Sequence, residues 1–441
     1  MSGIVGAVGP RAFQAVRSMQ QVLMHRGDVR RCSQGKLSND TEYAVSALGD
    51  AQFSATSGSS DLSITVSDTY HSSYAQASIV DSRVLRLDRD CIGSRPLFYG
   101  SNFKGSLCAF ASERKALWSV GIKRAQRVDP GITVAIHGPR SITFGTKKTL
   151  QQSSSNHSTN NELRVVNDLR ELLRSVMDEL TDEQMGVAFS GGVDSSLLCA
   201  IMANNANNQY FAAGLPESHD LKSAQQAARL MRIDLQIIAL DACHVEMLIP
   251  RVIETVESCN PLDLAIALPM YVLSEQTKEA GLKSIMTGQG ADELFAGYSR
   301  YARLAAVNYR GLRDALESDV LNIARNNLER DNLTAASHSI NVILPYLDPR
   351  VVKFGLTIDG TLKLNRGINK YILRKVAEQL LPHELAYRPK KALQYGTGVS
   401  AVLRKLARKN LPYDKRNSKG AVGIYLRSVA EKRGIVVADD N

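Results

Sequence analysis

The sequence lacks several features that would place it in a specialised class of protein. Its six cysteines are scattered, with no Cys-x-x-Cys pair and no histidine at zinc-binding spacing. We therefore expect free thiols in a reducing compartment. No run approaches the ~18 apolar residues of a membrane-spanning helix. The first residues have neither the basic region nor the apolar length of a secretory signal. These absences predict a cytoplasmic protein with no membrane partner.

The composition is that of an ordinary globular chain. Of the 441 residues, 44% are hydrophobic and 22% are charged, which excludes a disordered or fibrous protein. At roughly 150 residues per domain, the length predicts two or three domains. The 54 lysines and arginines exceed the 44 acidic residues, giving a formal charge of +10. This surplus permits a nucleic-acid partner without requiring one, because a protein that handles ATP also gains from a positive field.

A change of pattern divides the chain into two parts. Residues 1–148 contain short apolar and alternating segments separated by Gly, Asp and Ser, which is typical of a β-rich domain. Residues 149–162 are polar and are predicted to form a linker. Over residues 163–430 apolar strands alternate with helices, which predicts an α/β domain with a doubly wound parallel sheet. Only helical patterns follow Tyr301, and residues 431–441 are predicted to be a tail.

A glycine-rich loop follows the first strand of the second part. The string Ser190-Gly191-Gly192-Val193-Asp194-Ser195-Ser196 leaves a strand and opens a helix. Its glycines let backbone N–H groups approach phosphate oxygens, and the helix N-terminus adds positive charge. The carboxylate of Asp194 would repel phosphate unless Mg²⁺ lay between them. The loop lacks the lysine of the Walker motif. It resembles the PP-loop of enzymes that cleave ATP between the α- and β-phosphates and release pyrophosphate.

A second phosphate motif follows the fourth strand. A long helix predicted over Pro269–Ala280 leads to the strand Ser284–Thr287 and then to Gly288-Gln289-Gly290-Ala291-Asp292-Glu293. Ligands of a doubly wound sheet bind beyond the carboxyl ends of its strands. This placement predicts that Asp292 and Asp194 lie near the same phosphates and hold one Mg²⁺ between them.

Together these motifs resemble the synthetase half of the glutamine-dependent (class B) asparagine synthetases, a family that also includes β-lactam synthetases. Further segments match in order, namely Gly214–Ala224, Pro345–Asp348, Lys370–Arg374 and Arg388–Lys390. The resemblance implies a PP-loop fold, like that of the adenine nucleotide α-hydrolases, with a helical C-terminal part. It also implies ATP and Mg²⁺ as cofactors.

The resemblance assigns roles to individual residues. Asp194 and Asp292 would hold the metal. Lys390 would stabilise the negative charge that develops as an acyl-adenylate forms and is attacked. Gln289 stands at a second catalytic position. The implied ATP-binding residues are Ala188, Ser190, Gly191, Gly192, Asp194, Ser195, Ser196, Ala213, Thr287 and Gly288.

The first part resembles the glutaminase half of the same family, which is an N-terminal-nucleophile (Ntn) hydrolase. The segments Met1–Gly6, His25–Asp28 and Arg89–Tyr99 carry this likeness. The family nucleophile is a cysteine, and Ser2 stands in its place. A hydroxyl is a far poorer nucleophile, and the Asn-Gly-Glu segment that holds glutamine in the family is missing too. We therefore expect a retained scaffold without glutaminase activity, with ammonia or another amine as the nitrogen donor.

The acceptor side departs from the family as well. Gln289 replaces an acid inside the second motif, and it cannot take up a proton. Asn341-Val342-Ile343 replaces Glu-Val-Arg, so Ile343 cannot pair with a carboxylate. Arg330-Asp331 resembles part of an upstream Arg-Asp-Asp. Aspartate is therefore the default acid of the family rather than an acid that these residues select.

The leading hypothesis is an ATP-dependent amide ligase that adenylates a carboxylate, releases pyrophosphate and forms an amide. Two alternatives stay open. One is a catalytically degenerate ATP-binding homologue with a regulatory or partner role, which Ser2, Gln289, Asn341 and Ile343 favour. The other is a PP-loop RNA-modifying enzyme, which the basic run between Arg404 and Lys419 favours, although no catalytic cysteine pair supports a nucleic-acid substrate. A homo-oligomer and a separate ammonia donor are also left open.

Overall fold

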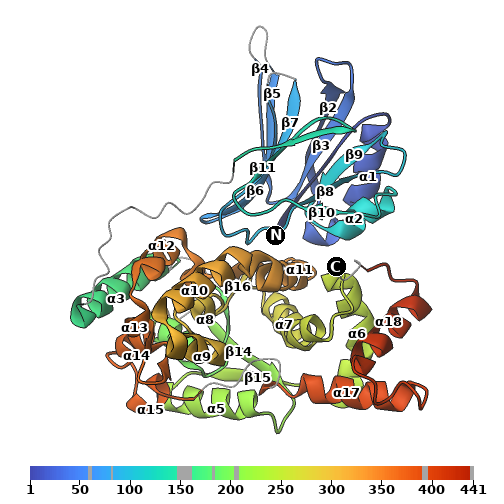
Figure 1. Ribbon diagram of the computed structural model, residues 1–441. Helices are drawn as coiled ribbons and strands as arrows, with labels where there is room; N and C mark the ends of the chain where they lie inside the picture. Colours follow the sequence, from blue (N-terminus) through green and yellow to red (C-terminus); the bar gives the residue numbers. More distant parts are fainter. Residues whose placement is uncertain are drawn as a thin grey trace.

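The computed structural model describes residues 1–57, 62–80, 83–146, 161–180, 184–202, 208–389 and 396–437. Figure 1 shows two units, one rich in strands and one in which helices surround a sheet. The predicted linker, 149–162, lies outside the described residues except for its last two positions. None of the described helices combines the length and the apolar composition needed to cross a bilayer.

The first unit is built from two six-stranded antiparallel sheets. One sheet has the order β10 (Gln126–Arg127), β8 (Phe98–Ser101), β9 (Cys108–Ala111), β1 (Ser2–Val8), β3 (Glu42–Gly49) and β2 (Val29–Lys36). The other has the order β12 (Ser141–Phe144), β11 (Thr133–Gly138), β7 (Val84–Arg89), β6 (Ser73–Val80), β5 (Leu62–Tyr70) and β4 (Gln52–Ser57). Alternation along β1 places Ile4 and Val8 between the sheets. It places Val5 and Ala7 under the helices α1 (Ala12–Val22) and α2 (Arg114–Ser119).

The second unit has a five-stranded sheet whose strands are all parallel. Its order is β15 (Leu235–Ala239), β14 (Gln209–Gly214), β13 (Gly186–Ala188), β16 (Ser284–Met286) and β17 (Asn341–Ile343). Helices cover both faces, as a parallel sheet requires. One face carries α3 (Glu162–Asp178), α4 (Val193–Ile201), α5 (His219–Met231) and α14 (Tyr371–Ala377). The other carries α6 (Ala242–Val256), α7 (Pro261–Glu279), α17 (Val399–Asn410) and α18 (Ala421–Arg433).

Further elements follow β16 along the chain. They are α8 (Ala291–Leu294), α9 (Ser299–Val307), α10 (Tyr309–Ile323), the π-helical segment Ala324–Leu328, α11 (Glu329–Ala336), α12 (Pro349–Thr357), α13 (Gly360–Lys363), β18 (Leu364–Asn365), β19 (Ile368–Asn369) and α15 (His383–Ala386).

Two of the predicted elements are wrong. Residues after Tyr301 are not all helical, because β17 adds a fifth strand to the sheet beside β16. A strand of three residues is too short to show a period, and its pairing with β16 is a long-range contact. Helix α7 begins at Pro261 rather than at Pro269, which lies inside the helix. Asn260 caps it, because its side chain accepts a hydrogen bond from the amide of Leu262 (2.9 Å).

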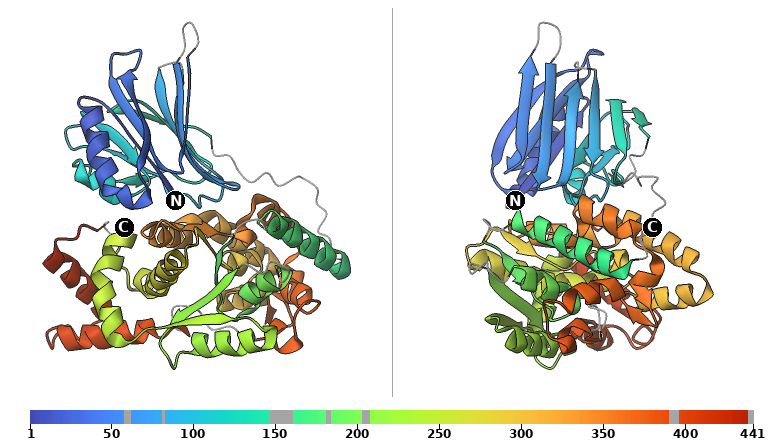
Figure 2. Two further views of the ribbon diagram at one scale, coloured as in Figure 1. Left: turned by 180° about the vertical axis from the view of Figure 1, so that it is seen from behind. Right: turned by 90° about the vertical axis from the view of Figure 1, so that its left-hand side faces the viewer.

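The two units meet across a face formed largely by α11, which lies directly under the strand-rich unit in Figures 1 and 2. Glu329 on this helix accepts hydrogen bonds from Arg89 (3.3 Å) and Arg127 (2.8 Å) of the first unit. Glu257, at the end of α6, accepts from the backbone amide of Lys115 (2.7 Å). Because these carboxylates are buried, separating the units would leave matched charges without partners.

Candidate active site

The glycine-rich loop connects β13 to α4 at the carboxyl end of the sheet. Gly191 has a φ of +68°, and a Cβ at this position would lie 2.4 Å from the carbonyl oxygen of Ser223. Only glycine fits such a close approach without strain. Arg388 anchors the loop, since its Nη1 donates to the carbonyl oxygens of Gly191 (3.2 Å) and Ser223 (2.7 Å). The loop is therefore fixed by contacts to its backbone.

The three serines of the loop differ in exposure. Ser190 is exposed, and its Oγ lies 3.1 Å from Oγ of Ser195. Ser195 is buried and donates to the carbonyl oxygen of Gly192 (3.3 Å). Ser196 is fully buried, and its hydroxyl has no hydrogen-bond partner among the described residues. The hydroxyl best placed to reach a phosphate is thus that of Ser190.

The second motif lies directly beside the first. The amide of Thr287 donates to the carbonyl oxygen of Ile343 in β17 (3.1 Å). Gly288 packs on Asp194 so closely that a Cβ would lie 3.0 Å from that residue's Cβ. Gln289 is half-buried, and its amide donates to Oγ1 of Thr287 (3.4 Å). Ala188 and Ala213 lie in the neighbouring strands β13 and β14. The sheet therefore brings the predicted nucleotide-binding residues to one edge.

Asp194 and Asp292 converge on a single nitrogen atom, Nζ of Lys370. This nitrogen lies 2.8 and 2.7 Å from the two carboxylate oxygens of Asp194 and 2.7 Å from Oδ1 of Asp292. The Lys370 side chain is 1% exposed, and the two carboxylates are 13% and 14% exposed. Lys370 reaches this position from a left-handed conformation (φ +57°) just before α14. Gly297 packs against the same groups, because a Cβ there would lie 1.9 Å from Oδ1 of Asp292.

This arrangement fits a magnesium ion bound together with a phosphate. The two carboxylates already share one cation, so their oxygens are close enough to share another. Among the described residues, no group of three or more His, Cys, Asp or Glu side chains could hold a metal without other ligands. Mg²⁺ is commonly bound by one or two carboxylates, with water and substrate phosphates completing its shell. Asp194 and Asp292 suit that role.

One predicted residue cannot be placed, and three others emerge from the structure. Lys390 lies outside the described residues. Lys370 and Arg388 belong to segments that carry the family resemblance, yet their sequence context does not reveal which groups they contact. Tyr346 is fully buried, and its hydroxyl donates to the backbone carbonyl oxygen of Asp194 (3.0 Å). In the sequence, only the match of segment Pro345–Asp348 to the family pointed to this tyrosine.

The residues predicted to lie on the acceptor side include polar groups that pair with other groups of the protein. Arg330 is buried in α11, and its Nη2 lies 2.8 Å from the carboxylate of the neighbouring Asp331. Its Nη1 lies 3.7 Å from Asp263. Ile343 is buried, and Asn341 bonds to the first unit rather than facing the nucleotide loop.

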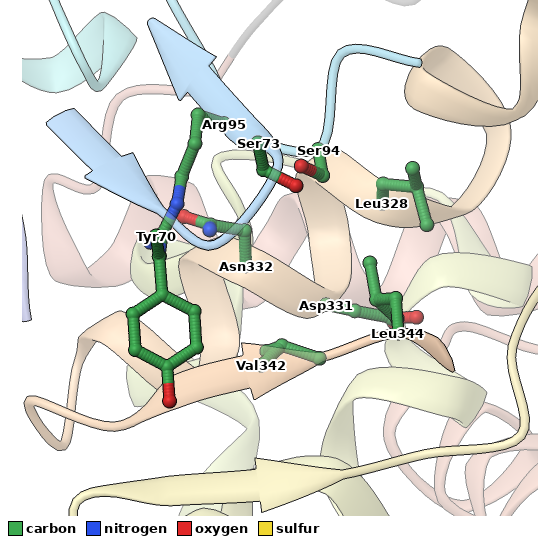
Figure 3. A pocket seen from close by; sticks show the side chains of 9 residues that line it. All are labelled: Tyr70, Ser73, Ser94, Arg95, Leu328, Asp331, Asn332, Val342 and Leu344. Atoms are coloured by element: carbon green, nitrogen blue, oxygen red, sulfur yellow. The ribbon is translucent and has the colours of Figure 1, made fainter. Parts of the chain in front are cut away.

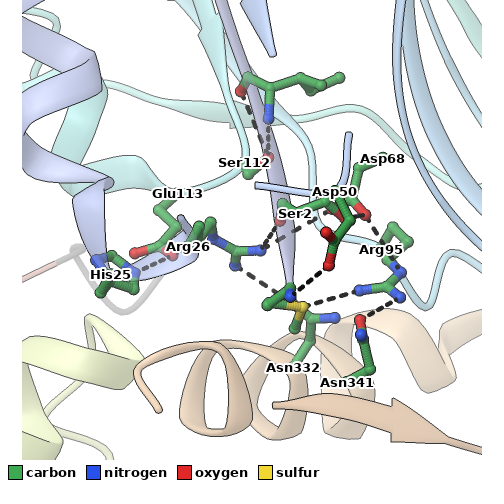
Figure 4. A network of polar contacts seen from close by, with 12 residues as sticks. Ser2, His25, Arg26, Asp50, Asp68, Arg95, Ser112, Glu113, Asn332 and Asn341 are labelled. Atoms are coloured by element: carbon green, nitrogen blue, oxygen red, sulfur yellow. Dashed lines mark hydrogen bonds and ion pairs between the residues drawn. The ribbon is translucent and has the colours of Figure 1, made fainter. Parts of the chain in front are cut away.

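Ser2, at the position of the family nucleophile, is packed inside a buried polar cluster (Figure 4). Its hydroxyl donates to Asp68, which is fully buried, and its carbonyl oxygen accepts from Arg26 (2.9 Å). Arg26 is also paired with Glu113. Burial acts to raise the pKa of Glu113, but His25, Lys115 and Arg26 outweigh it and hold the pKa well below its usual range. The Ser2 hydroxyl thus already has a carboxylate partner within the protein.

The family model and the sequence relatives agree on one family. The asparagine synthase family matches residues 168–314 and 305–431. A putative glutamine-hydrolysing asparagine synthetase of Methanocaldococcus jannaschii is 31% identical over 378 residues, which cover 74% of this chain and 69% of that protein. A probable asparagine synthetase of Acanthamoeba polyphaga mimivirus is 28% identical, with coverage of 69% and 59%. Asparagine synthetase B of Escherichia coli is 27% identical, with coverage of 71% and 59%.

The chain therefore spans between 59% and 69% of the length of these relatives. Among solved structures, an NMN synthetase from Francisella tularensis overlays with a TM-score of 0.31 and 9% identity, over 64% of this chain and 99% of that one. That likeness is too remote to bear on function.

Proposed function

Because the chain belongs to the asparagine synthase family, we propose that it is an ATP- and Mg²⁺-dependent ligase that forms an amide from a carboxylic acid and ammonia or an amine. Aspartate is the default acid. The observation that carries this proposal is the convergence of Asp194 and Asp292 on one cation beside a glycine-rich loop.

The reaction consists of two displacements. An oxygen of the carboxylate attacks the α-phosphorus of ATP, the bond to the β-phosphate oxygen breaks, and pyrophosphate leaves. The amine then attacks the acyl carbon, AMP leaves, and the amine nitrogen loses its extra proton. The backbone amides beyond Gly191 and the hydroxyl of Ser190 would bind the phosphates, and the strand ends at Ala188 and Ala213 would face the adenine.

Cations govern the charge at the site. Mg²⁺ held by Asp194 and Asp292 would neutralise the pyrophosphate. Lys370, released from the two carboxylates, would be free to contact a phosphate oxygen, and Lys390 would face the reacting centre. Each of these interactions would strengthen as negative charge develops, which is the condition for catalysis by charge stabilisation. Gln289 would donate a hydrogen bond on the acceptor side and would not act as a base.

We further propose that the first unit, residues 1–148, is an Ntn-type scaffold without glutaminase activity, followed by a linker over 149–162 and a PP-loop ligase domain over 163–430. The bond from Ser2 to Asp68 and the burial of both side chains support the loss of the nucleophile's role. Ammonia would then come from solution or from a separate donor. The free, scattered cysteines are in keeping with a cytoplasmic location.

The test is pyrophosphate release from ATP with a panel of acids, each supplied with ammonium or with glutamine. We expect release that requires Mg²⁺ and one acid, with ammonium but not glutamine as the donor. Turnover with glutamine would contradict the loss of glutaminase activity. Tight ATP binding with no release for any acid would instead support the catalytically degenerate homologue.

A further inference from the structure

Arginines of the first unit donate many of the hydrogen bonds between the two units, and Ser339 of the second unit donates in the opposite direction, to the carbonyl oxygen of His25 (2.6 Å). Five arginines of the first unit donate to four side chains of the second, across sequence separations of more than a hundred residues. The donors are Arg26, Arg89, Arg95, Arg114 and Arg127, and the acceptors are Glu257, Glu329, Asn332 and Asn341. Three of these arginines, Arg26, Arg89 and Arg95, are at most 2% exposed. A guanidinium held this deeply is a rigid, directional donor.

Two of the contacts start from the buried cluster around Ser2. Arg95 Nη2 donates to Oδ1 of Asn341 (2.9 Å), and its Nε lies 3.6 Å from Asp68. Arg26 Nη2 donates to Oδ1 of Asn332 (3.2 Å). The cluster that replaces a hydrolase site is therefore continuous with the second unit, as the dashed contacts in Figure 4 show.

Little space separates the units at this point. The cavity between them has a volume of about 10 Å³, which admits about one water molecule. Tyr70 and Arg95 line it from the first unit, and Asn332 and Val342 line it from the second (Figure 3). A displacement of Arg95 would therefore be transmitted to Asn341 rather than absorbed.

Asn341 opens β17, which pairs with β16, the strand that leads into the second phosphate motif. The carbonyl oxygen of Ile343 in this strand accepts from the amide of Thr287, two residues before Gln289. Just after the strand, Leu347 packs so tightly on Gly290 that a Cβ there would lie 2.5 Å from it. The strand that Arg95 holds thus supports the backbone on both sides of Gln289.

We propose that the first unit is a positioning domain for the acceptor side of the ligase site, acting through the Arg95–Asn341 hydrogen bond. This inference rests on the proposed ligase function. On the nucleotide side, β17 holds Thr287, whereas Lys370 holds Asp194 and Arg388 holds Gly191 by contacts that do not involve this strand. Loosening the strand therefore raises the KM for the acid more than the KM for ATP.

The experiment measures ATP–pyrophosphate exchange in the full-length protein and in a double-mutant cycle of Arg95→Lys and Asn341→Leu. We expect each single variant to raise the KM for the acid about tenfold, since misplacement of about 1 Å can cost up to a hundredfold in rate. The KM for ATP should stay within about twofold. The double variant should add little to either single change, because both remove the same contact.

Arg127→Lys is the matched control. It alters an arginine that contacts Glu329 in the same interface but is not bonded to Asn341. A positioning role predicts an unchanged KM for the acid in this variant, even if its melting temperature falls. If the KM for the acid rose equally in Arg95→Lys, Asn341→Leu and Arg127→Lys, the loss of interface stability alone would explain the effect. This result would overturn the proposal.

Hydrogen exchange gives a readout that does not depend on turnover. Amides in peptides covering residues 284–290 should exchange faster in Asn341→Leu than in wild type, and at the wild-type rate in Arg127→Lys. If the wild-type protein is active but Arg95→Lys and Asn341→Leu change neither the KM for the acid nor the hydrogen exchange of these peptides, this inference alone is overturned. If the wild-type protein catalyses no ATP–pyrophosphate exchange with any acid, the proposed function is overturned, and this inference with it.

Discussion

Two of the buried sites that combine carboxylates with cations differ in what surrounds them. Around Asp68 the cations are Arg26 and Arg95, all three side chains are at most 2% exposed, and Ser2 adds a hydroxyl. Around Lys370 the carboxylates of Asp194 and Asp292 stay more than 10% exposed. The first site is closed by its own side chains, and the second borders the glycine-rich backbone of both phosphate motifs.

The difference teaches how a permanent charge cluster differs from a binding site that uses similar groups. Arginine presents several donors in a fixed plane and suits a contact that never opens. Lysine is a compact cation on a flexible chain, so a metal ion can take its place between two carboxylates. Gly191 and Gly297 permit close packing around the open site, because a Cβ there would lie 2.4 Å from the carbonyl oxygen of Ser223 or 1.9 Å from Oδ1 of Asp292.

The largest expected effect comes from neutralising the open site. Asp194→Asn or Asp292→Asn should lower the rate of pyrophosphate exchange by about a thousandfold, comparable to removal of a charge-stabilising group at other active sites. Asp68→Asn is the matched variant in the closed site. It should lower the melting temperature but change the exchange rate less than about tenfold. Similar losses in both variants would erase the distinction between the two sites.

The next effect concerns the closed interface. Removing one partner of a buried charge cluster costs about 3–5 kcal/mol, so Glu329→Gln should lower the free energy of unfolding by about that amount. Burial acts to raise the pKa of Glu329, but the bond from Arg127 and the charges of Arg89 and Arg114 lower it overall.

The pH dependence of that interface has a defined sign. A carboxylate whose folded pKa lies below its unfolded value stabilises the fold above the ordinary Glu pKa of about 4.3. That stability is lost as the pH falls through the folded pKa. Wild type should therefore lose more stability than Glu329→Gln when chemical denaturation is compared at pH 7 and below pH 4. Parallel losses in both proteins would show that Glu329 is not responsible.

A smaller effect compares two buried lysines. Lys370 has two carboxylate partners, so Lys370→Met should lower the melting temperature, and Mg²⁺ should raise it more in the variant than in wild type. Lys363 is 3% exposed, and its burial lowers its pKa to about 7. Lys363→Met should therefore raise the melting temperature at pH 7.

The difference in melting temperature between Lys363→Met and wild type should vanish at high pH. The folded state favours the neutral amine, so stability rises as the pH climbs from the folded pKa toward the unfolded value of about 10.4. Differential scanning calorimetry at pH 7 and pH 10 measures the melting temperatures of Lys370→Met, Lys363→Met and wild type. A destabilised Lys363→Met would mean that the amine has a partner that the structure does not show.

The smallest expected effect is that of Ser2→Ala. If the first unit has no hydrolase role, ammonium-dependent turnover should stay within about twofold of wild type, because the Ser2 hydroxyl bonds to Asp68 in the closed site. Loss of that hydrogen bond to a charged group should lower the stability by about 1.5–3 kcal/mol. Glutamine consumption should be absent in both proteins. Loss of a glutamine-dependent rate in Ser2→Ala would show that the closed site still opens.

The sequence predicted the parts of this molecule that depend on local pattern. The mixed α/β organisation and the family resemblance are confirmed. Gly191 and Gly288 were recognisable because a loop between strand and helix that binds phosphate needs glycine at particular positions. Such signals lie within a few consecutive residues.

The rest depends on tertiary contacts that leave no local trace. The Arg95–Asn341 bond joins residues 246 positions apart. Lys370 reaches the two carboxylates from a left-handed backbone conformation that non-glycine residues seldom adopt. Strand β17 owes its existence to its pairing with β16. The placement of Lys390 stays a prediction.

The fate of a carboxylate oxygen tests the account most directly. The accepted acid, labelled with ¹⁸O in its carboxyl group, is incubated with ATP, Mg²⁺ and ammonium, and the nucleotide product is analysed by mass spectrometry. Attack on the α-phosphorus predicts AMP that carries one ¹⁸O atom, together with unlabelled pyrophosphate. Formation of ADP with the label in inorganic phosphate would contradict adenylation at this site.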